Sequence, residues 1–109
     1  MANIILVTAE EGLAAELLRV LDPQQHRITL CEGPISAIAA LRVGSTGCKL
    51  IALNMSRNRN EEWEALDRIS EAVAFSGAAI KIVCFSLVYW GAQMQLAVER
   101  RGARFVYIQ

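Results

Sequence analysis

The feature that most constrains this chain is a short apolar run, Leu50-Ile51-Ala52-Leu53, which lies between Lys49 and Asn54. The polar, helix-poor segment 56–60 follows it closely. An unbroken apolar run of this length, bounded by turn-forming residues, is typical of a strand at the centre of a parallel α/β sheet. Functional groups of open parallel sheets lie just beyond the carboxyl ends of the strands. The sequence therefore places Asn54 where chemistry would be expected, and this residue is an amide rather than a carboxylate.

Apolar runs that alternate with helical patterns surround this central strand. Residues 3–8 and 27–31 are predicted strands before it, and residues 80–85 and 104–109 are predicted strands after it. Helices are expected where apolar residues recur at helical spacing, over residues 13–21, 34–43, 60–76 and 91–101. Five strands alternating with four helices predict an α/β fold with a doubly wound parallel sheet. Right-handed crossovers would place helices on both faces of that sheet.

The size and charge of the chain argue against several classes of protein. With 109 residues it is expected to form one domain. Its 11 basic and 11 acidic residues cancel, so no general electrostatic argument favours nucleic acid or an anionic membrane as a partner. No apolar run approaches the roughly 18 residues of a membrane span, and the N-terminus leads directly into a predicted strand rather than a signal peptide. We therefore expect a cytoplasmic protein.

The cysteines and the histidine do not indicate a metal or cofactor site. Cys31, Cys48 and Cys84 are an odd number and show no Cys-x-x-Cys spacing. Cys31 and Cys84 lie inside apolar strand patterns, where a free cysteine acts as a small buried hydrophobe. His26 is the one histidine, so a zinc site is not expected.

Four segments in order carry a resemblance to a known family. Residues 5–7 followed by 9–11 resemble a first strand with an acidic pair, and residues 50–55 resemble a strand that ends in a phosphoacceptor aspartate. Residues 82–86 resemble the strand that ends in a switch Ser/Thr, and residues 102–106 resemble a Gly-Ala turn into the last strand. Together they resemble the receiver domain of bacterial two-component response regulators, over nearly the whole chain.

The resemblance implies a flavodoxin-like, five-stranded parallel sheet in the order 2-1-3-4-5, with four helices. Residues 1–109 would form one receiver-like domain, alone or within a longer parent protein. The fifth helix of the family would be missing after the last strand. The apolar side chains of residues 105–108 would then need a neighbouring subunit, another domain or a shifted first helix to cover one face.

The residues that carry phosphoryl transfer in the family are largely replaced here. That chemistry needs a carboxylate nucleophile, a Mg²⁺ ion held by carboxylate oxygens and a neutralising cation. The acid pair aligns with Ala9 and Glu10, the nucleophile with Asn54 and the lysine with Gln109, whereas Ser86 fits the pattern unchanged. An amide cannot form an acyl phosphate. We therefore interpret the chain as a degenerate, or pseudo-, receiver that is not phosphorylated at Asn54.

Two interpretations of this end of the sheet remain open. Glu10, Asn54, Ser56 and Ser86 are expected to converge there. The favoured interpretation is a vestigial pocket held together by hydrogen bonds. The alternative is a small-ligand site built on the old phosphate pocket.

Four consecutive apolar residues, 87–90, follow Ser86 in a predicted loop. They either fold inward over the sheet edge or form an interaction patch, since Trp and Tyr are enriched at the centres of interfaces. Receivers commonly dimerise through the fourth helix, fifth strand and fifth helix, so the resemblance points to this region. The predicted interaction surface comprises Leu87, Val88, Tyr89, Trp90, Met94, Phe105 and Tyr107.

These observations bear on three classes of function. The first is a phosphorylation-independent signalling module that binds a protein partner or itself, with a homodimer expected. The second is a small-molecule-binding domain. The third and least favoured is an enzyme, because residues 9–12 offer one glycine and two acids where a phosphate loop would need glycines. No histidine accompanies a nucleophile, so we expect no catalytic residues and no cofactor.

Overall fold

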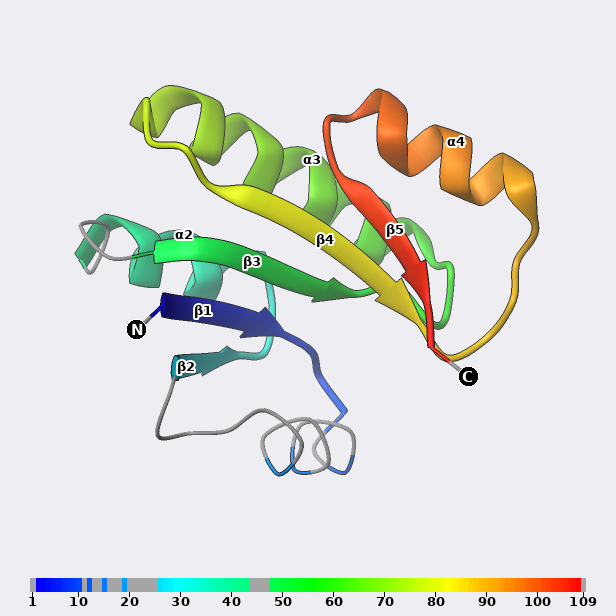
Figure 1. Cartoon of the computed structure of the whole chain (residues 1–109), viewed down its shortest axis with the longest axis horizontal. Coiled ribbons are helices and arrows are strands. Elements are labelled where there is room, and N and C mark those ends of the chain that lie inside the picture. Colours follow the sequence, from blue (N-terminus) through cyan, green and yellow to red (C-terminus); the bar gives the residue numbers. More distant parts are fainter. Residues whose placement is uncertain are drawn as a thin grey trace.

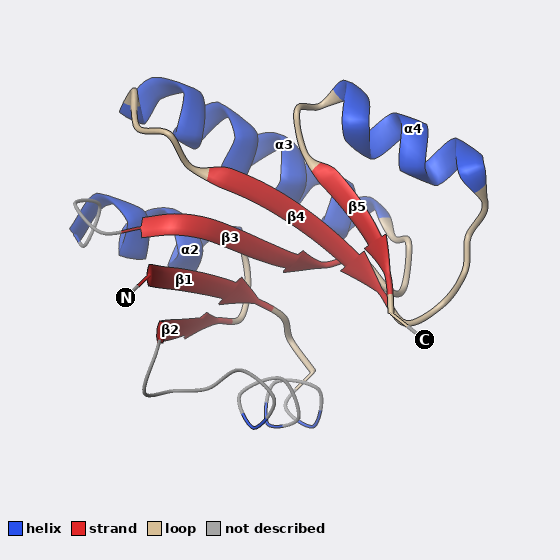
Figure 2. Cartoon of the chain, viewed as in Figure 1, coloured by secondary structure: helices blue, strands red, loops and turns tan. Residues whose placement is uncertain are grey.

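The computed structural model describes residues 2–10, 12, 15, 19, 26–43 and 48–108. Five parallel strands form one sheet in the order β2-β1-β3-β4-β5, as predicted (Figures 1 and 2). The strands are β1 (Ala2–Val7), β2 (His26–Cys31), β3 (Cys48–Asn54), β4 (Lys81–Ser86) and β5 (Arg104–Tyr107). The helices within the described part are α2 (Pro34–Val43), α3 (Asn60–Ser76) and α4 (Ala92–Arg100).

The central position of β3 follows from its apolar sequence. Ile51 lies level with Ile5 of β1 on one side and with Ile82 of β4 on the other. Side chains alternate between the two faces of a strand, so Ile51 and Leu53 share one face and Leu50 and Ala52 share the other. Both faces are therefore apolar, as expected of a strand inside a parallel sheet.

The main core lies between one face of the sheet and the three helices. It is built from residues that alternate along the strands and from the inner sides of the helices: Ile5, Val7, Cys31, Ala37, Leu41, Cys48, Ile51, Leu53, Met55, Ala65, Leu66, Ile69, Ile82, Cys84, Met94, Val98 and Ala103. The prediction that Cys31 and Cys84 are buried is confirmed, and Cys48 is buried as well.

Particular residues explain where helix α3 begins and ends. The Glu62 carboxylate accepts a hydrogen bond from the Arg59 backbone N–H at 3.2 Å, which satisfies one free amide at the helix start. The helix ends at Gly77, whose φ of 68° is left-handed and suits glycine. Trp63 packs against the core from α3, and the Arg101 guanidinium lies 4.8 Å from the centre of its ring.

One expected helix lies outside the described residues, and one expected strand is shorter than predicted. The helix predicted over residues 13–21 lies almost wholly outside the described residues, of which only Ala15 and Arg19 fall within it. The last strand ends at Tyr107 rather than at Gln109, and Gln109 itself is outside the described residues.

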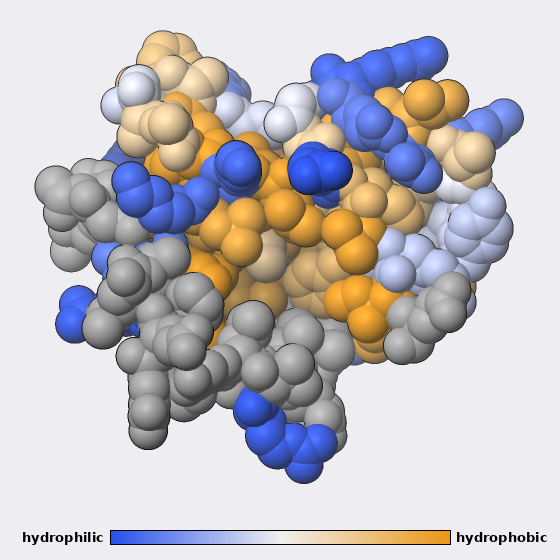
Figure 3. Space-filling view, in the orientation of Figure 1, coloured by the Kyte–Doolittle hydropathy of each residue, from blue (hydrophilic) through white to orange (hydrophobic). Residues whose placement is uncertain are grey.

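The described helices α2, α3 and α4 all pack on one face of the sheet. They do not test the prediction of helices on both faces, because residues 13–21 lie almost wholly outside the described residues. Figure 3 looks onto the other face of the sheet and shows apolar side chains across its middle. In Figure 1 the strands lie in front of α2 and α3, and α4 lies beside β5 at the sheet edge. The opposite face carries Leu50 and Ala52 of β3, Val83 and Phe85 of β4, and Val106 of β5, in register across the three strands. No described helix covers these five side chains.

Candidate functional site

Asn54 lies at the carboxyl end of β3, where polar side chains of neighbouring segments meet it. Its Nδ2 group donates a hydrogen bond to Thr8 Oγ1 at 3.1 Å. Its Oδ1 atom accepts hydrogen bonds from the Ser56 N–H at 3.0 Å and from the Ser56 hydroxyl at 2.6 Å. Asn54 is only 6% exposed, so these three bonds are made away from water, where they stabilise most.

Thr8 is the partner that sequence reasoning missed. It follows β1 directly and is 6% exposed, and its hydroxyl also accepts a hydrogen bond from the Glu10 N–H at 3.1 Å. The only signal in the sequence is its place as the first polar residue after an apolar strand. Its contact with Asn54 joins residues 46 positions apart, and the register of the two strands determines it.

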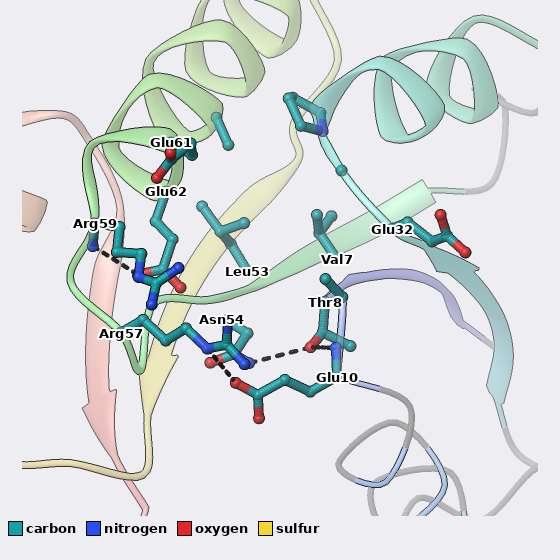
Figure 4. Close-up of a pocket in the computed structure, with 14 residues that line it drawn as sticks. Val7, Thr8, Glu10, Glu32, Leu53, Asn54, Arg57, Arg59, Glu61 and Glu62 are labelled. Atoms are coloured by element: carbon teal, nitrogen blue, oxygen red, sulfur yellow. Dashed lines mark hydrogen bonds and ion pairs between the residues drawn. The ribbon is translucent and has the colours of Figure 1, made fainter.

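A shallow cavity of ≈ 280 Å³ lies in front of Asn54 (Figure 4). Four acidic and two basic residues line it: Glu10, Glu32, Glu61, Glu62, Arg57 and Arg59. Arg57 pairs with Glu10 across the opening, with Arg57 Nε 3.3 Å from Glu10 Oε1. Their side chains are 57% and 32% exposed, so water screens this ion pair.

The predicted pocket residues are brought together in part. Ala9, Glu10 and Asn54 line the cavity, and Ser56 lies behind Asn54 as its hydrogen-bond partner. Ser86 is fully buried at the end of β4, but its hydroxyl is turned to the loop that follows. There it donates to the Val88 carbonyl at 2.6 Å and accepts from the Val88 N–H at 3.0 Å.

Ser56 joins this site to the apolar loop. Its hydroxyl accepts a hydrogen bond from the Leu87 N–H at 3.0 Å, and its carbonyl accepts one from the indole Nε1 of Trp90 at 2.9 Å. A continuous chain of hydrogen bonds therefore runs from Thr8 through Asn54 and Ser56 to residues 87 and 90.

The loop does not fold inward. Leu87, Val88, Tyr89 and Trp90 are 43%, 46%, 64% and 43% exposed. The Tyr89 ring packs against Tyr107 of β5, which is 41% exposed, at a centroid distance of 5.6 Å. These five residues form one exposed apolar area, which we call the loop surface.

Two residues of the predicted interaction surface do not belong to it. Met94 is 5% exposed because it lies on the inner side of α4 and contributes to the core. Phe105 is half-buried and packs against the same core, since it alternates with the outward-facing Val106 along β5. The prediction that Met94 lies on the surface was therefore wrong, and Phe105 is only partly exposed.

The thiols are poor candidates for chemistry. Burial raises the pKa of Cys84 to about 12, and burial also raises the pKa values of Cys31 and Cys48. The reactive thiolate is therefore disfavoured at all three positions near neutral pH. Across the described part of the chain, no three His, Cys, Asp or Glu side chains gather in a way that could hold a metal ion. No described helix is long and apolar enough to cross a membrane.

The sequence matches no protein-family model and no curated protein. The fold, in contrast, resembles many solved structures. The signal receiver domain of a LuxO repressor protein from Vibrio parahaemolyticus aligns over 97% of this chain and 77% of its own, with a TM-score of 0.76 and 16% identity. A chain of the complex of CheX and CheY with beryllofluoride and magnesium from Borrelia burgdorferi aligns over 99% of this chain and 78% of its own, with a TM-score of 0.78 and 13% identity.

A pilus assembly-related protein from Burkholderia pseudomallei is similar to the same extent. It aligns over 98% of this chain and 78% of its own, with a TM-score of 0.74 and 19% identity. The class defined by these likenesses is the receiver-domain fold, and this chain has that fold. Because the sequence identities are below one fifth, the similarity to these structures shows the fold alone.

Proposed function

We propose that this chain is a non-catalytic, receiver-like signalling module that associates with proteins without being phosphorylated. The single observation that carries the proposal is the set of hydrogen bonds that the Asn54 amide makes. The Asn54 oxygen accepts two hydrogen bonds from Ser56, so neither of its lone pairs is left for a metal ion. The nitrogen donates to Thr8, and a neutral amide is no nucleophile for a phosphoryl group. Asn54, at the position that would accept a phosphoryl group, instead stabilises the fold by linking Thr8 to Ser56.

The neighbouring charges support the same proposal. Ala9 offers no oxygen ligand, and the Glu10 carboxylate is paired with Arg57. Four glutamates against two arginines make the cavity a poor site for a phosphate, because like charges repel. A cavity of ≈ 280 Å³ is also at the lower limit for a small-molecule pocket, which favours association with a protein over binding of a small ligand.

The loop surface is the proposed site of association. In this loop, Ser56 and Ser86 bond the backbone of residues 87 and 88, and Ser56 also bonds the indole of Trp90. An exposed apolar area that is already ordered loses little conformational entropy on binding. Tyr89, Trp90 and Tyr107 supply the aromatic side chains that dominate interface energetics. A second copy of this chain is the proposed partner, and another protein is the alternative.

Titration with Mg²⁺ and beryllofluoride tests whether the site responds to a phosphoryl mimic. Trp90 is a natural fluorescence probe, because its indole bonds to Ser56, which in turn bonds to Asn54. We expect no saturable change in wild-type fluorescence. The double variant Ala9→Asp/Asn54→Asp restores two carboxylates and is expected to respond to Mg²⁺ in the same assay. A wild-type response that equals that of the double variant would contradict the proposal.

A further inference from the structure

A second and larger cavity lies between helices α2 and α3, which pack beside each other behind the sheet in Figure 1. Its volume of ≈ 640 Å³ is more than twice that of the cavity at Asn54 and falls within the roughly 300–1,000 Å³ of small-molecule sites. We call it the helix groove. Its lining includes Ile38, Leu41 and Arg42 of α2 and Arg68, Ala72 and Phe75 of α3.

The inner part of the helix groove is apolar. Leu41 is buried in the core, and Ile38 and Ala72 are half-buried. Phe75, in contrast, is 83% exposed, so a large phenyl ring stands beside these aliphatic side chains in contact with water. A ligand with an apolar body would remove this ring and its neighbours from water, which is favourable.

The charged residues of the helix groove favour an anion. Arg42 of α2 and Arg68 of α3 are both exposed, and neither forms an ion pair with a described residue. Glu71 is the one acidic side chain among the described lining residues, so one positive charge is in excess. The cavity at Asn54 has the opposite excess, with four glutamates against two arginines. A guanidinium group presents its N–H donors in a fork that matches a carboxylate.

The length of the helix groove limits the length of its ligand. Along α3 the lining extends from Arg68 to Ser76, which is eight residues or about 12 Å at 1.5 Å per residue. An apolar chain or ring of medium length fits this distance.

We propose that the helix groove binds a small amphipathic monocarboxylate, in which one carboxylate is joined to an apolar chain or ring. The apolar part would lie along Ile38, Ala72 and Phe75, and the guanidinium groups of Arg42 and Arg68 would attract the carboxylate. A dianion such as a phosphate ester fits less well, because Glu71 repels a second negative charge. No residue of the loop surface lines the helix groove, so this inference and the proposed association can fail separately.

Isothermal titration calorimetry with decanoate, below its micelle concentration, tests the proposal. Decyltrimethylammonium is the matched counterpart, because it carries the same apolar chain with a positive charge. We expect decanoate to bind saturably, and about tenfold more tightly than the cation at low ionic strength. This difference should shrink as salt is added, because both arginines are exposed.

Charge removal in the helix groove provides the decisive comparison. The variant Arg42→Gln/Arg68→Gln keeps polar side chains at both positions and should weaken decanoate binding about tenfold or more. The control Arg27→Gln/Arg100→Gln removes the same charge at exposed positions outside the groove and should change affinity less than about twofold.

A second pair of variants tests the apolar part of the helix groove. Phe75→Ser removes the exposed ring and should weaken binding of both ligands several-fold, because each carries the same chain. Leu96→Ser, at a 54% exposed position on α4 outside the groove, should leave both affinities unchanged.

Amide chemical-shift mapping then locates decanoate. We expect perturbations at Ile38, Arg68 and Phe75 in a protein whose circular dichroism stays unchanged. The proposal would be overturned by the absence of saturable binding, by equal affinity for the two ligands, or by perturbations confined to residues 87–90. Full affinity in Arg42→Gln/Arg68→Gln would also overturn it. If decanoate does not bind and Phe75→Ser instead weakens self-association, the groove is an interface between copies of this chain, which contradicts the proposal.

Discussion

At the scale of single residues, Asn54 shows how a potential reaction centre can become part of the framework. The amide donates to one neighbouring segment and accepts from another, whereas an ionised carboxylate could only accept. Thr8 Oγ1 accepts from both the Glu10 N–H and the Asn54 amide, which occupies both lone pairs of the hydroxyl. The chemistry of the site thus follows from one functional group and the direction of its hydrogen bonds.

Cys84 gives a pH prediction at the same scale. Its pKa is raised from 9.0 to about 12 by burial, so above pH 9 the unfolded state releases this proton before the folded state does. Its contribution to stability is complete below pH 9 and is lost as the pH rises toward 12. The free energy of unfolding should fall by about 1.4 kcal/mol more per pH unit in wild type than in Cys84→Ala over this range.

Urea denaturation at several alkaline pH values measures this difference. Effects of pH that wild type and Cys84→Ala share cancel when the two proteins are compared. Parallel pH profiles for wild type and Cys84→Ala would show that the thiol of Cys84 is not protected from ionisation in the folded state.

At the scale of elements, the loop surface depends on Ser56 as much as on its own residues. Ser56→Ala removes the acceptor of the Leu87 N–H and one partner of Asn54, while the carbonyl that binds Trp90 remains. Loss of buried hydrogen bonds of this kind typically costs about 1 to 3 kcal/mol. We expect faster proteolytic cleavage within residues 87–91, with the secondary structure intact.

Limited proteolysis followed by mass spectrometry measures the cleavage, and Ser76→Ala is the matched control. Ser76 also uses its hydroxyl in local hydrogen bonds, but it lies in the exposed last turn of α3. Equal cleavage of the loop in wild type and Ser56→Ala would show that Ser56 does not order it.

Much of the fold could be predicted because each strand carries its own signal. The apolar run 50–53 and the Gly77 stop are local features, and both occur where the structure has them. Whether the side chains of Met94 and Phe105 face the core or the solvent could not be predicted, because this depends on which face of the sheet each helix covers. The bond between Asn54 and Thr8 likewise depends on strand register, which one sequence does not reveal.

At the scale of the whole molecule, two described surfaces have distinct chemistry. The cavity at Asn54 is predominantly acidic, and the loop surface is aromatic and apolar. A phosphoryl group would therefore be repelled from the first, whereas an apolar partner surface would bind the second.

Sedimentation equilibrium over a concentration series tests the central claim, which is association without phosphorylation through the loop surface. We predict a monomer–dimer equilibrium in the absence of any phosphoryl donor, unchanged by Mg²⁺ and acetyl phosphate. Tyr89→Ser should shift it toward monomer by about tenfold or more, because Tyr89 is the most exposed aromatic residue of the loop surface. Phe75→Ser, at an 83% exposed position on α3, should leave it unchanged. A monomer at all concentrations, or a dimer that forms only with the phosphoryl donor, would contradict the account.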